Sequence, residues 1–174
     1  MTAPRVSPDL MGASPVMRTF DEFSRATVRR QLRGAVDPRI VEIVRLRCAR
    51  YHDCRLCASV RVLDAELDDP MAAKIDRYES SDLPDAWKAA LRLADAVIMM
   101  PGAVGEDLRA DVRRHFDDDQ ISQLLFSIMK WSCQKALVSL RVDIPQEEGT
   151  PVTYDRDGHR IIGTAAIRAF QQAG

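Results

Sequence analysis

The feature that most constrains the fold is a helical pattern of apolar residues that runs, with short breaks, from about residue 16 to residue 144. Signals that begin and end helices recur within it. Asp37 followed by Pro38 is a cap with proline at the first helical position, and Pro101 with Gly102 ends a helix. The segment 40–46 is apolar over a broad face, which is typical of a central helix. The pattern therefore predicts an all-α fold.

The same reasoning gives the expected helix bounds. They are 20–32, 38–50, 70–78, 84–100, 106–116 and 119–141. In the last of these, one stripe recurs at helical spacing and is predicted to pack against the core; it consists of Ile121, Leu124, Leu125, Ile128, Met129 and Ser132.

The two ends of the chain differ from this helical domain of residues 16–144. Residues 1–15 contain three prolines and are expected to form an extended, mobile arm. In residues 145–174, Val152–Tyr154 and His159–Ile162 flank an Asp-Gly turn, which predicts a short β-hairpin followed by a terminal helix over 164–172. A hairpin alone is marginal in water. We expect it to pack on its own domain or, our preference, on a neighbouring subunit.

Composition excludes several classes of protein. A chain of 174 residues that is 46% apolar, with 29% charged residues and a net charge of −1, is one globular domain's worth. The sequence has no basic stretch interleaved with aromatic residues, so nothing in it indicates a nucleic-acid partner. The longest apolar run, Ala96–Met100, is far shorter than the roughly 20 residues that a membrane span requires. The first residues lack a secretory signal, so we expect a cytoplasmic protein.

The strongest chemical signal is the pair Cys54 and Cys57. Residues three apart share a helix face, so the two sulfurs can meet, and Asp53 is an expected N-cap for that helix. Such a dithiol can cycle to a disulfide, one thiolate attacking and the other sulfur resolving. The alternative is that both are small residues packed in a core helix. Cys133 is expected to be buried at a helix contact, with a role in lining the site as the alternative.

Glu42 lies twelve residues before Cys54, on the other side of any straight helix that carried both. The two residues meet only if the chain reverses, and residues 51–53 are where a reversal is expected. A glutamate beside the dithiol would help to position protons. The alternative for Glu42 is an ion pair with Arg39 or Arg45 at three-residue spacing.

With Glu42, Cys54 and Cys57, the segment 37–67 resembles the core of the carboxymuconolactone decarboxylase and alkylhydroperoxidase D superfamily. The resemblance extends over about residues 20–144. It implies an all-α helical bundle that assembles as a trimer or hexamer. It also implies that, in redox-active relatives, the second cysteine reacts, the first resolves, and a glutamate and a histidine relay protons.

The sequence departs from that superfamily's redox motif at Arg61, which stands four residues after Cys57 in place of the histidine. A guanidinium can stabilise a thiolate or bind an anion, but it does not exchange protons near neutral pH. His52 is the nearest imidazole and is a candidate replacement base, with an exposed turn histidine as the alternative. Zinc held by the cysteines and His52 is a less favoured hypothesis. We expect no metal and no cofactor.

The leading hypothesis is a thiol-dependent peroxidase or disulfide oxidoreductase, with a peroxide as substrate and a thiol reductant protein as partner. Cys57 would attack and Cys54 would resolve. A second hypothesis is lyase or isomerase chemistry on a small anionic lactone, with Arg61 holding its carboxylate. A third is a non-catalytic, oligomeric binding or stress-related module that has lost its relay histidine.

Overall fold

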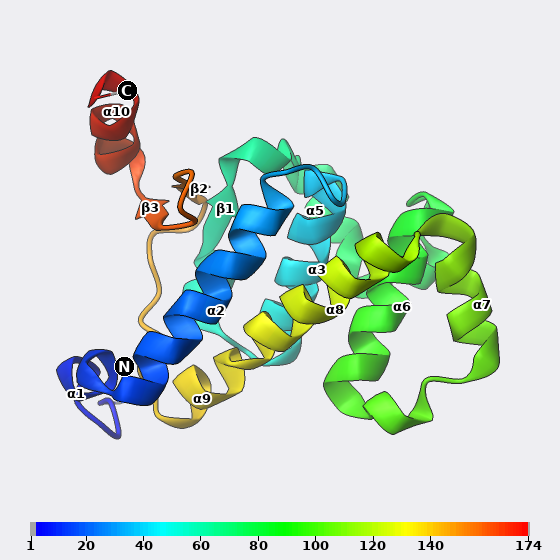
Figure 1. Ribbon diagram of the computed structural model, residues 1–174, viewed down its shortest axis with the longest axis horizontal. Helices are drawn as coiled ribbons and strands as arrows, with labels where there is room; N and C mark the ends of the chain where they lie inside the picture. The colour runs from blue at the N-terminus through cyan, green and yellow to red at the C-terminus, as the bar shows by residue number, and fades with distance from the viewer. Residues whose placement is uncertain (1–2, 174) are drawn as a thin grey trace.

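The computed structural model describes residues 3–173, most of them in helices, with a small sheet on one side of the helical body (Figure 1). Within these residues, no helix is both long and apolar enough to cross a membrane. The α-helices are α1 (Pro8–Ala13), α2 (Pro15–Gln31), α3 (Pro38–Tyr51), α4 (Arg55–Ser59), α5 (Asp69–Ala73), α6 (Asp85–Met99), α7 (Glu106–His115), α8 (Asp118–Ser132), α9 (Gln134–Ser139) and α10 (Thr164–Ala173). The 3-10 helices are η1 (Leu63–Ala65), η2 (Lys74–Ser80) and η3 (Pro101–Ala103), and the strands are β1 (Val60–Val62), β2 (Thr150–Tyr154) and β3 (Arg160–Ile162).

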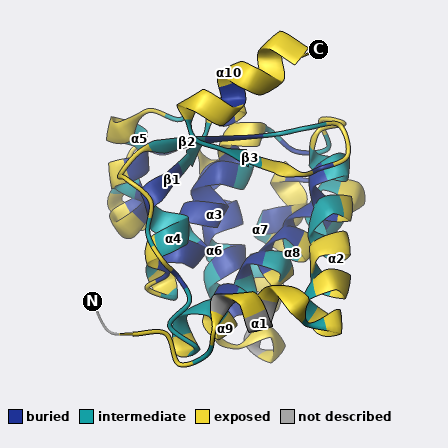
Figure 2. Ribbon diagram, turned by 90° about the vertical axis from the view of Figure 1, so that its left-hand side faces the viewer, coloured by how far each residue is buried: buried dark blue, intermediate teal, exposed yellow. Residues whose placement is uncertain are grey.

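Helix α3 is central because it is covered on almost every side. It packs against α6 and α8, and α2 lies against α8. Ile43 and Val44 of α3 are fully buried together with Leu91 of α6 and Ile128 of α8. In Figure 2, α3 and α6 are largely buried, whereas α2 has an exposed outer face. The predicted all-α core with a central helix after Asp37 is confirmed.

The helix starts follow local capping chemistry. The Asp37 carboxylate accepts a hydrogen bond of 2.8 Å from the Arg39 backbone N–H, which satisfies one free donor at the start of α3. Asp117 and Gln120 form a reciprocal capping box at the start of α8. The expected helix over 119–141 is wrong at one point, because it is interrupted at Cys133. There the backbone N–H bonds to the Lys130 carbonyl three residues back, and this tighter turn separates α8 from α9.

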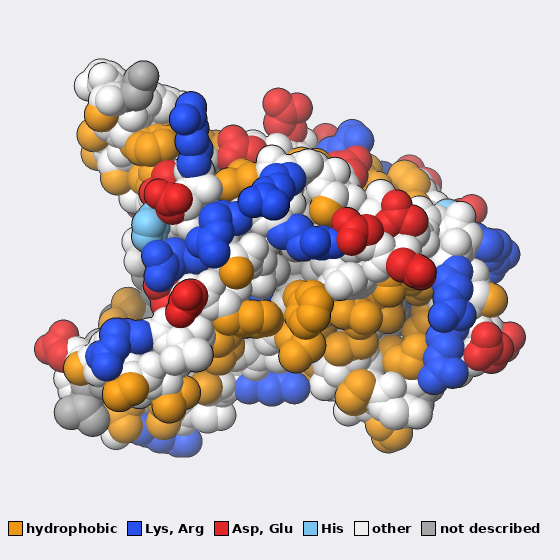
Figure 3. Space-filling view, viewed as in Figure 1, with side chains coloured by type: hydrophobic (Ala, Val, Ile, Leu, Met, Phe, Trp, Pro, Cys, Tyr) orange, Lys and Arg blue, Asp and Glu red, His pale blue; other side chains and the backbone are white. Residues whose placement is uncertain are grey.

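The apolar stripe of α8 divides between two environments. Leu124 and Ile128 are buried in the core as predicted, but Met129 is 55% exposed. Ile121 and Leu125 are partly buried and also pack against the core. With Met129 and Ser132 they line an open apolar groove of about 780 Å³ between α6, α7 and α8. Figure 3 shows this groove as a band of hydrophobic side chains across the body. The prediction that the stripe packs against the core is therefore confirmed for Ile121, Leu124, Leu125 and Ile128 and wrong for Met129.

The expectation that the first fifteen residues are extended is wrong at residues 8–13, which form the short helix α1. Proline is tolerated in the first turn of a helix, where its missing N–H has no partner to lose. The segment before α1 is held against the end of α9. The Arg5 backbone N–H bonds to the Leu140 carbonyl at 2.8 Å, and its guanidinium bonds to the Ser139 carbonyl at 2.8 Å.

The predicted hairpin forms and joins the sheet of its own chain. Strand β2 lies between β1, to which it is parallel, and β3, to which it is antiparallel. Because β1 follows α4, this pairing brings residues 150–162 against the centre of the helical domain. Helix α10 then projects from the body, with Ile167 buried and Phe170 44% exposed (Figure 2). Packing of this end on a neighbouring subunit stays a prediction.

The tip of the hairpin rests on α2. Gly158 has φ of +82°, the left-handed conformation that the predicted Asp-Gly turn requires. The His159 ring bonds to the Asp155 carboxylate at 2.9 Å and, through Nε2, to the Arg25 guanidinium at 2.9 Å. Arg29 donates to the Asp157 carbonyl at 3.0 Å. These contacts fix the hairpin over the outer side of α2.

Gly158→Ala should therefore destabilise the protein more than Gly149→Ala. Gly149 also has a positive φ, of +79°, but open space surrounds it, so alanine there costs about 1–2 kcal/mol for the backbone alone. At Gly158 a Cβ would lie 2.6 Å from the Arg25 carbonyl oxygen, so the hairpin must also shift from α2. Urea unfolding of both variants measures the difference, and equal losses of stability would contradict the docking.

Candidate active site

The chain reverses direction immediately before the CxxC pair, as predicted. Asp53 has φ of +53°, and the Cys54 N–H reaches back to the Ala49 carbonyl at 2.9 Å while the Asp53 N–H bonds to the Arg50 carbonyl at 3.2 Å. This pair of bonds is a Schellman motif, which closes α3. Asp53 does not cap the next helix, contrary to expectation, because its left-handed backbone belongs to that closure. The Asp143 carboxylate accepts from the Arg55 N–H instead, at 3.2 Å.

A buried ion pair joins α3 to the segment that carries the cysteines. The Arg45 guanidinium donates two hydrogen bonds to the Glu42 carboxylate, of 2.6 and 2.7 Å. It also donates to the carbonyls of Cys57 and Val60, at 2.5 and 2.8 Å. Glu42 is 2% exposed and Arg45 5%, so neither charge is screened by water. Of the two partners considered for Glu42, the structure selects Arg45, while Arg39 pairs with Asp37.

The two cysteines of the pair occupy different environments. Cys54 is completely buried, whereas Cys57 is partly exposed and lines a cavity. A hydrogen bond from the Cys54 thiol, together with the positive charges of Arg45 and Arg160, lowers the pKa of Cys57 to about 7 against the opposing effect of burial. Donating that bond, and being buried, raises the pKa of Cys54. Near neutral pH a substantial fraction of Cys57 is therefore thiolate, whereas Cys54 is a protonated thiol.

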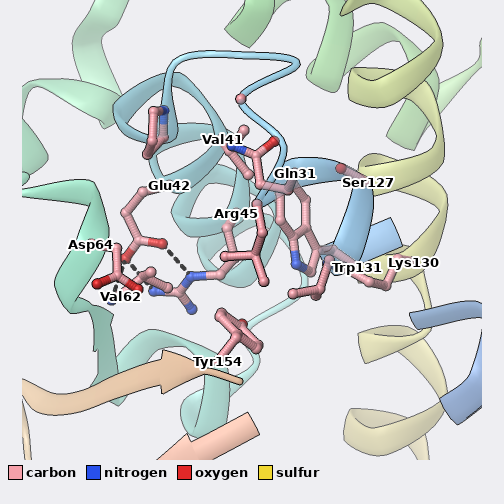
Figure 4. Close-up of a pocket in the computed structure, with 14 residues that line it drawn as sticks. Gln31, Val41, Glu42, Arg45, Val62, Asp64, Ser127, Lys130, Trp131 and Tyr154 are labelled. Carbon is pink, nitrogen blue, oxygen red and sulfur yellow. Dashed lines mark hydrogen bonds and ion pairs between the residues drawn. The ribbon is translucent and has the colours of Figure 1, made fainter. Parts of the chain in front are cut away.

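The cavity in front of Cys57 has a volume of about 560 Å³. Apolar side chains form much of its wall, among them Phe20 and Val28 of α2 and Leu137 of α9. A second hollow, of about 250 Å³, shares part of this wall and extends to Glu42. In Figure 4, Glu42 and Arg45 point toward one another, Tyr154 reaches in from β2, and Trp131 and Lys130 come from α8. Figure 3 shows Lys and Arg side chains gathered over α2 on the outside.

The hairpin and α8 add polar groups to the cavity. Tyr154 and Arg160 lie directly opposite each other in the β2–β3 register, so both side chains fall on one face of the hairpin, and both line the cavity. Lys130 lines it from α8. Burial by the surrounding protein, with Arg45 and Arg160 nearby, lowers the pKa of Lys130 to about 8. Burial likewise raises the pKa of Tyr154.

Known proteins resemble this chain in sequence and in fold. No protein-family model matches the chain. Two uncharacterized Mycobacterium tuberculosis proteins, from the CDC 1551 / Oshkosh and H37Rv strains, are each 39% identical to it over 150 residues. The matches cover 83% of this chain but 52% of each relative, so the chain spans about half the length of these curated relatives.

A solved structure resembles the fold over most of its length. It is the crystal structure of an Agrobacterium tumefaciens protein of unknown function, which its description proposes to be the antioxidant defence protein AhpD. The TM-score is 0.69, and the match covers 83% of this chain and 100% of the other. The chain has an alkylhydroperoxidase D-like fold. At 17% sequence identity, the likeness concerns the fold.

Within this alkylhydroperoxidase D-like fold, His52 and Arg61 lie apart from the described cavity lining. His52 ends α3 and stacks edge-on against Tyr51, and burial lowers its pKa. The Arg61 guanidinium donates to Glu148 at 2.8 Å and to the Ala58 carbonyl at 2.6 Å. Helix α4 ends at Ser59, so Arg61 lies in β1 and not one helical turn after Cys57. Side chains alternate along a strand, so Arg61 points away from the face on which Val60 and Val62 line the cavity.

The remaining cysteines also find definite places. Cys48 is completely buried in α3, and burial raises its pKa. Among the residues that the structure describes, no three histidine, cysteine or acidic side chains gather as a metal site. The zinc hypothesis thus has no geometric support in residues 3–173. Cys133 lines the cavity at the α8–α9 break, which was the alternative considered for it.

Sequence reasoning missed most of the cavity. Arg45 was considered only as a partner for Glu42, and Lys130, Gln134, Tyr154 and Arg160 were not singled out. A basic residue next to a helix break or in a hairpin gives no local signal of a site. The alternation of Tyr154 and Arg160 about the Asp-Gly turn was the one available sign that they share a face.

The thiol titration can be tested by alkylation with iodoacetamide as a function of pH. The rate at Cys57 should rise through about pH 7 and level off above it, since the thiolate is the reactive form and its pKa is lowered. Cys54→Ala removes the hydrogen-bond donor and should move the midpoint upward, whereas Cys133→Ala should leave it unchanged. Peptide mapping identifies the labelled residue. A wild-type midpoint of about 8.5, the value of an ordinary thiol, would contradict the lowered pKa of Cys57.

The ion pair makes a separate prediction about stability. Arg45→Met should lower the free energy of unfolding by about 3–5 kcal/mol, because it leaves the Glu42 carboxylate buried and unpaired. The double variant Glu42→Met/Arg45→Met should lose less, since that charge is also gone. Urea unfolding measures both. A loss below about 1 kcal/mol for Arg45→Met would mean that the pair behaves as an exposed one.

Proposed function

We propose that the chain is a thiol peroxidase in which Cys57 attacks a hydroperoxide and Cys54 resolves the product. The observation that carries this proposal is the asymmetric cysteine pair: the Cys57 sulfur faces a cavity beside fixed positive charges, and Cys54 is completely buried. The fold is consistent with it, and the Agrobacterium protein of similar fold is described as a proposed antioxidant defence protein.

The chemistry follows from where each sulfur lies. The Cys57 thiolate attacks the distal oxygen of the hydroperoxide, the O–O bond breaks, and the departing alkoxide takes a proton from solvent. Cys57 is then a sulfenic acid. The Cys54 sulfur attacks it, its proton leaves with the hydroxyl as water, and a disulfide forms. An external dithiol returns the pair to the reduced state by thiol–disulfide exchange.

Fixed charges take the place of a proton relay in this proposal. Arg45 is held by Glu42 and two carbonyls, so it stabilises the thiolate without moving. The Glu42 carboxylate accepts hydrogen bonds from two guanidinium nitrogens of Arg45, Nε and Nη2. Glu42 therefore acts through Arg45, as a positioning residue. The hypothesis of lactone chemistry relied on Arg61 as the carboxylate anchor, and the ion pair of Arg61 with Glu148 directs that side chain elsewhere.

Assembly into trimers or hexamers and a thiol reductant protein as partner are predictions that accompany this function. The open groove between α6, α7 and α8 is one apolar surface that remains uncovered in the single chain.

Mild hydrogen peroxide should convert the reduced protein into a species with a Cys54–Cys57 disulfide, which a dithiol reverses. Mass spectrometry of alkylated digests detects it. Cys54→Ser should stop at a sulfenic acid on Cys57 that dimedone traps, and Cys57→Ser should form neither product. Cys48→Ala is the matched control, because Cys48 is completely buried in α3 outside the described cavity lining, and it should give the same products as wild type. If both thiols of the wild-type protein remain alkylatable after peroxide, the proposed function is wrong.

A further inference from the structure

Two cations in the cavity have no counter-ion. Arg45 is paired with Glu42, and Arg25, also in the wall, is paired with Asp21. Lys130 and Arg160 line the same cavity, and within residues 3–173 neither forms an ion pair. Arg160 lies close enough to both Lys130 and Cys57 to lower their pKa values. Like charges that line one cavity repel each other, and a bound anion relieves that repulsion.

A buried amide points to the same place. Gln134 is 3% exposed and lines the cavity beside Cys57. Its amide lies close enough to the Cys57 sulfur to help lower the pKa of that thiol, and its amide oxygen has no hydrogen-bond partner among the described residues. Burying a polar group without a partner is costly. The amide oxygen in the cavity wall is therefore an acceptor available to a ligand.

The charge count indicates a monoanion. Lys130 and Arg160 contribute two positive charges, and the Cys57 thiolate contributes one negative charge, which leaves one positive charge uncompensated. A carboxylate neutralises it, whereas a dianion would bring excess negative charge beside the thiolate. Apolar side chains of Phe20, Val28 and Leu137 line the same cavity, so we expect the rest of the ligand to be apolar.

We propose that the hydroperoxide reduced by this protein carries a carboxylate, which Lys130 and Arg160 bind while its apolar body lies against α2. This inference rests on the proposed function and specifies its substrate class. The peroxide oxygen reaches Cys57, and the carboxylate is not altered in the reaction. The product is the corresponding hydroxy acid, with one water and the Cys54–Cys57 disulfide.

Binding can be measured without any reaction, using 4-isopropylbenzoate and the neutral, similarly shaped 4-isopropylbenzamide as probes. By calorimetry, the reduced wild-type protein should bind the benzoate about tenfold more tightly than the benzamide, a difference of about 1.4 kcal/mol. Lys130→Met and Arg160→Met should each abolish most of this preference. Arg160 is exposed on β3, so its variant keeps the test valid even if Lys130→Met folds poorly.

Arg156→Met is the matched control, because Arg156 is an exposed arginine of the same hairpin that is not part of the described cavity wall. It should retain the wild-type preference. Equal affinity for the two probes in the wild-type protein, or an unchanged preference in both cavity variants, would overturn the inference.

The kinetic arm compares cumene hydroperoxide with its para-carboxylate, following the oxidation of Cys57 by stopped-flow fluorescence of Trp131 and by alkylation. The carboxylate should react about tenfold faster in the wild-type protein, and at nearly the same rate as cumene hydroperoxide in Arg160→Met. If both peroxides oxidise Cys57 equally fast, the substrate class is wrong and the proposed function stands. If benzoate binds as expected but neither peroxide oxidises Cys57, the proposed function fails, and this substrate fails with it.

Discussion

The Arg45 guanidinium connects three parts of the molecule, and the site depends on it. Its two bonds to Glu42 keep it charged within the core, and its bonds to the Cys57 and Val60 carbonyls fix α4 and the start of β1 against α3. Buried charges are tolerated when they are paired and fully hydrogen-bonded. One side chain thus both positions the reactive cysteine and supplies a positive charge beside it.

The two cysteines differ in burial, and this difference separates their pKa values. Cys54 follows the closure of α3 and is completely enclosed, so its thiol stays protonated and donates to its neighbour. Cys57 lies one helical turn later, where the wall opens into the cavity. A static charge cannot carry protons as an imidazole can. In the proposed function, a stabilised thiolate is therefore combined with proton exchange through solvent, unlike in the histidine-containing motif that the sequence resembles.

The hairpin completes a site that the helical domain leaves open. Pairing of β2 with β1 brings Tyr154 and Arg160 to a cysteine nearly a hundred residues earlier in the chain, and Gly158 fixes the tip on α2. A short hairpin has little stability alone, but here it shares hydrogen bonds with β1 and contacts with α2. In the sequence the hairpin looks like a separate segment after the helical domain, so its part in forming the cavity wall was not predicted.

The sequence by itself indicated most of the core helices, the reversal at residues 51–53, the Asp-Gly hairpin and the proximity of the two cysteines, because each depends on periodicity, capping or turn chemistry within a few residues. It did not show the break at Cys133 or the short helix α1. It also indicated the alkylhydroperoxidase D-like fold. Only the tertiary structure decided that Glu42 pairs with Arg45 rather than Arg39, that Arg61 faces Glu148, and that Lys130, Gln134 and Arg160 meet around Cys57. The physical reason is that burial and charge pairing depend on which distant segments pack together, and no local pattern encodes that arrangement.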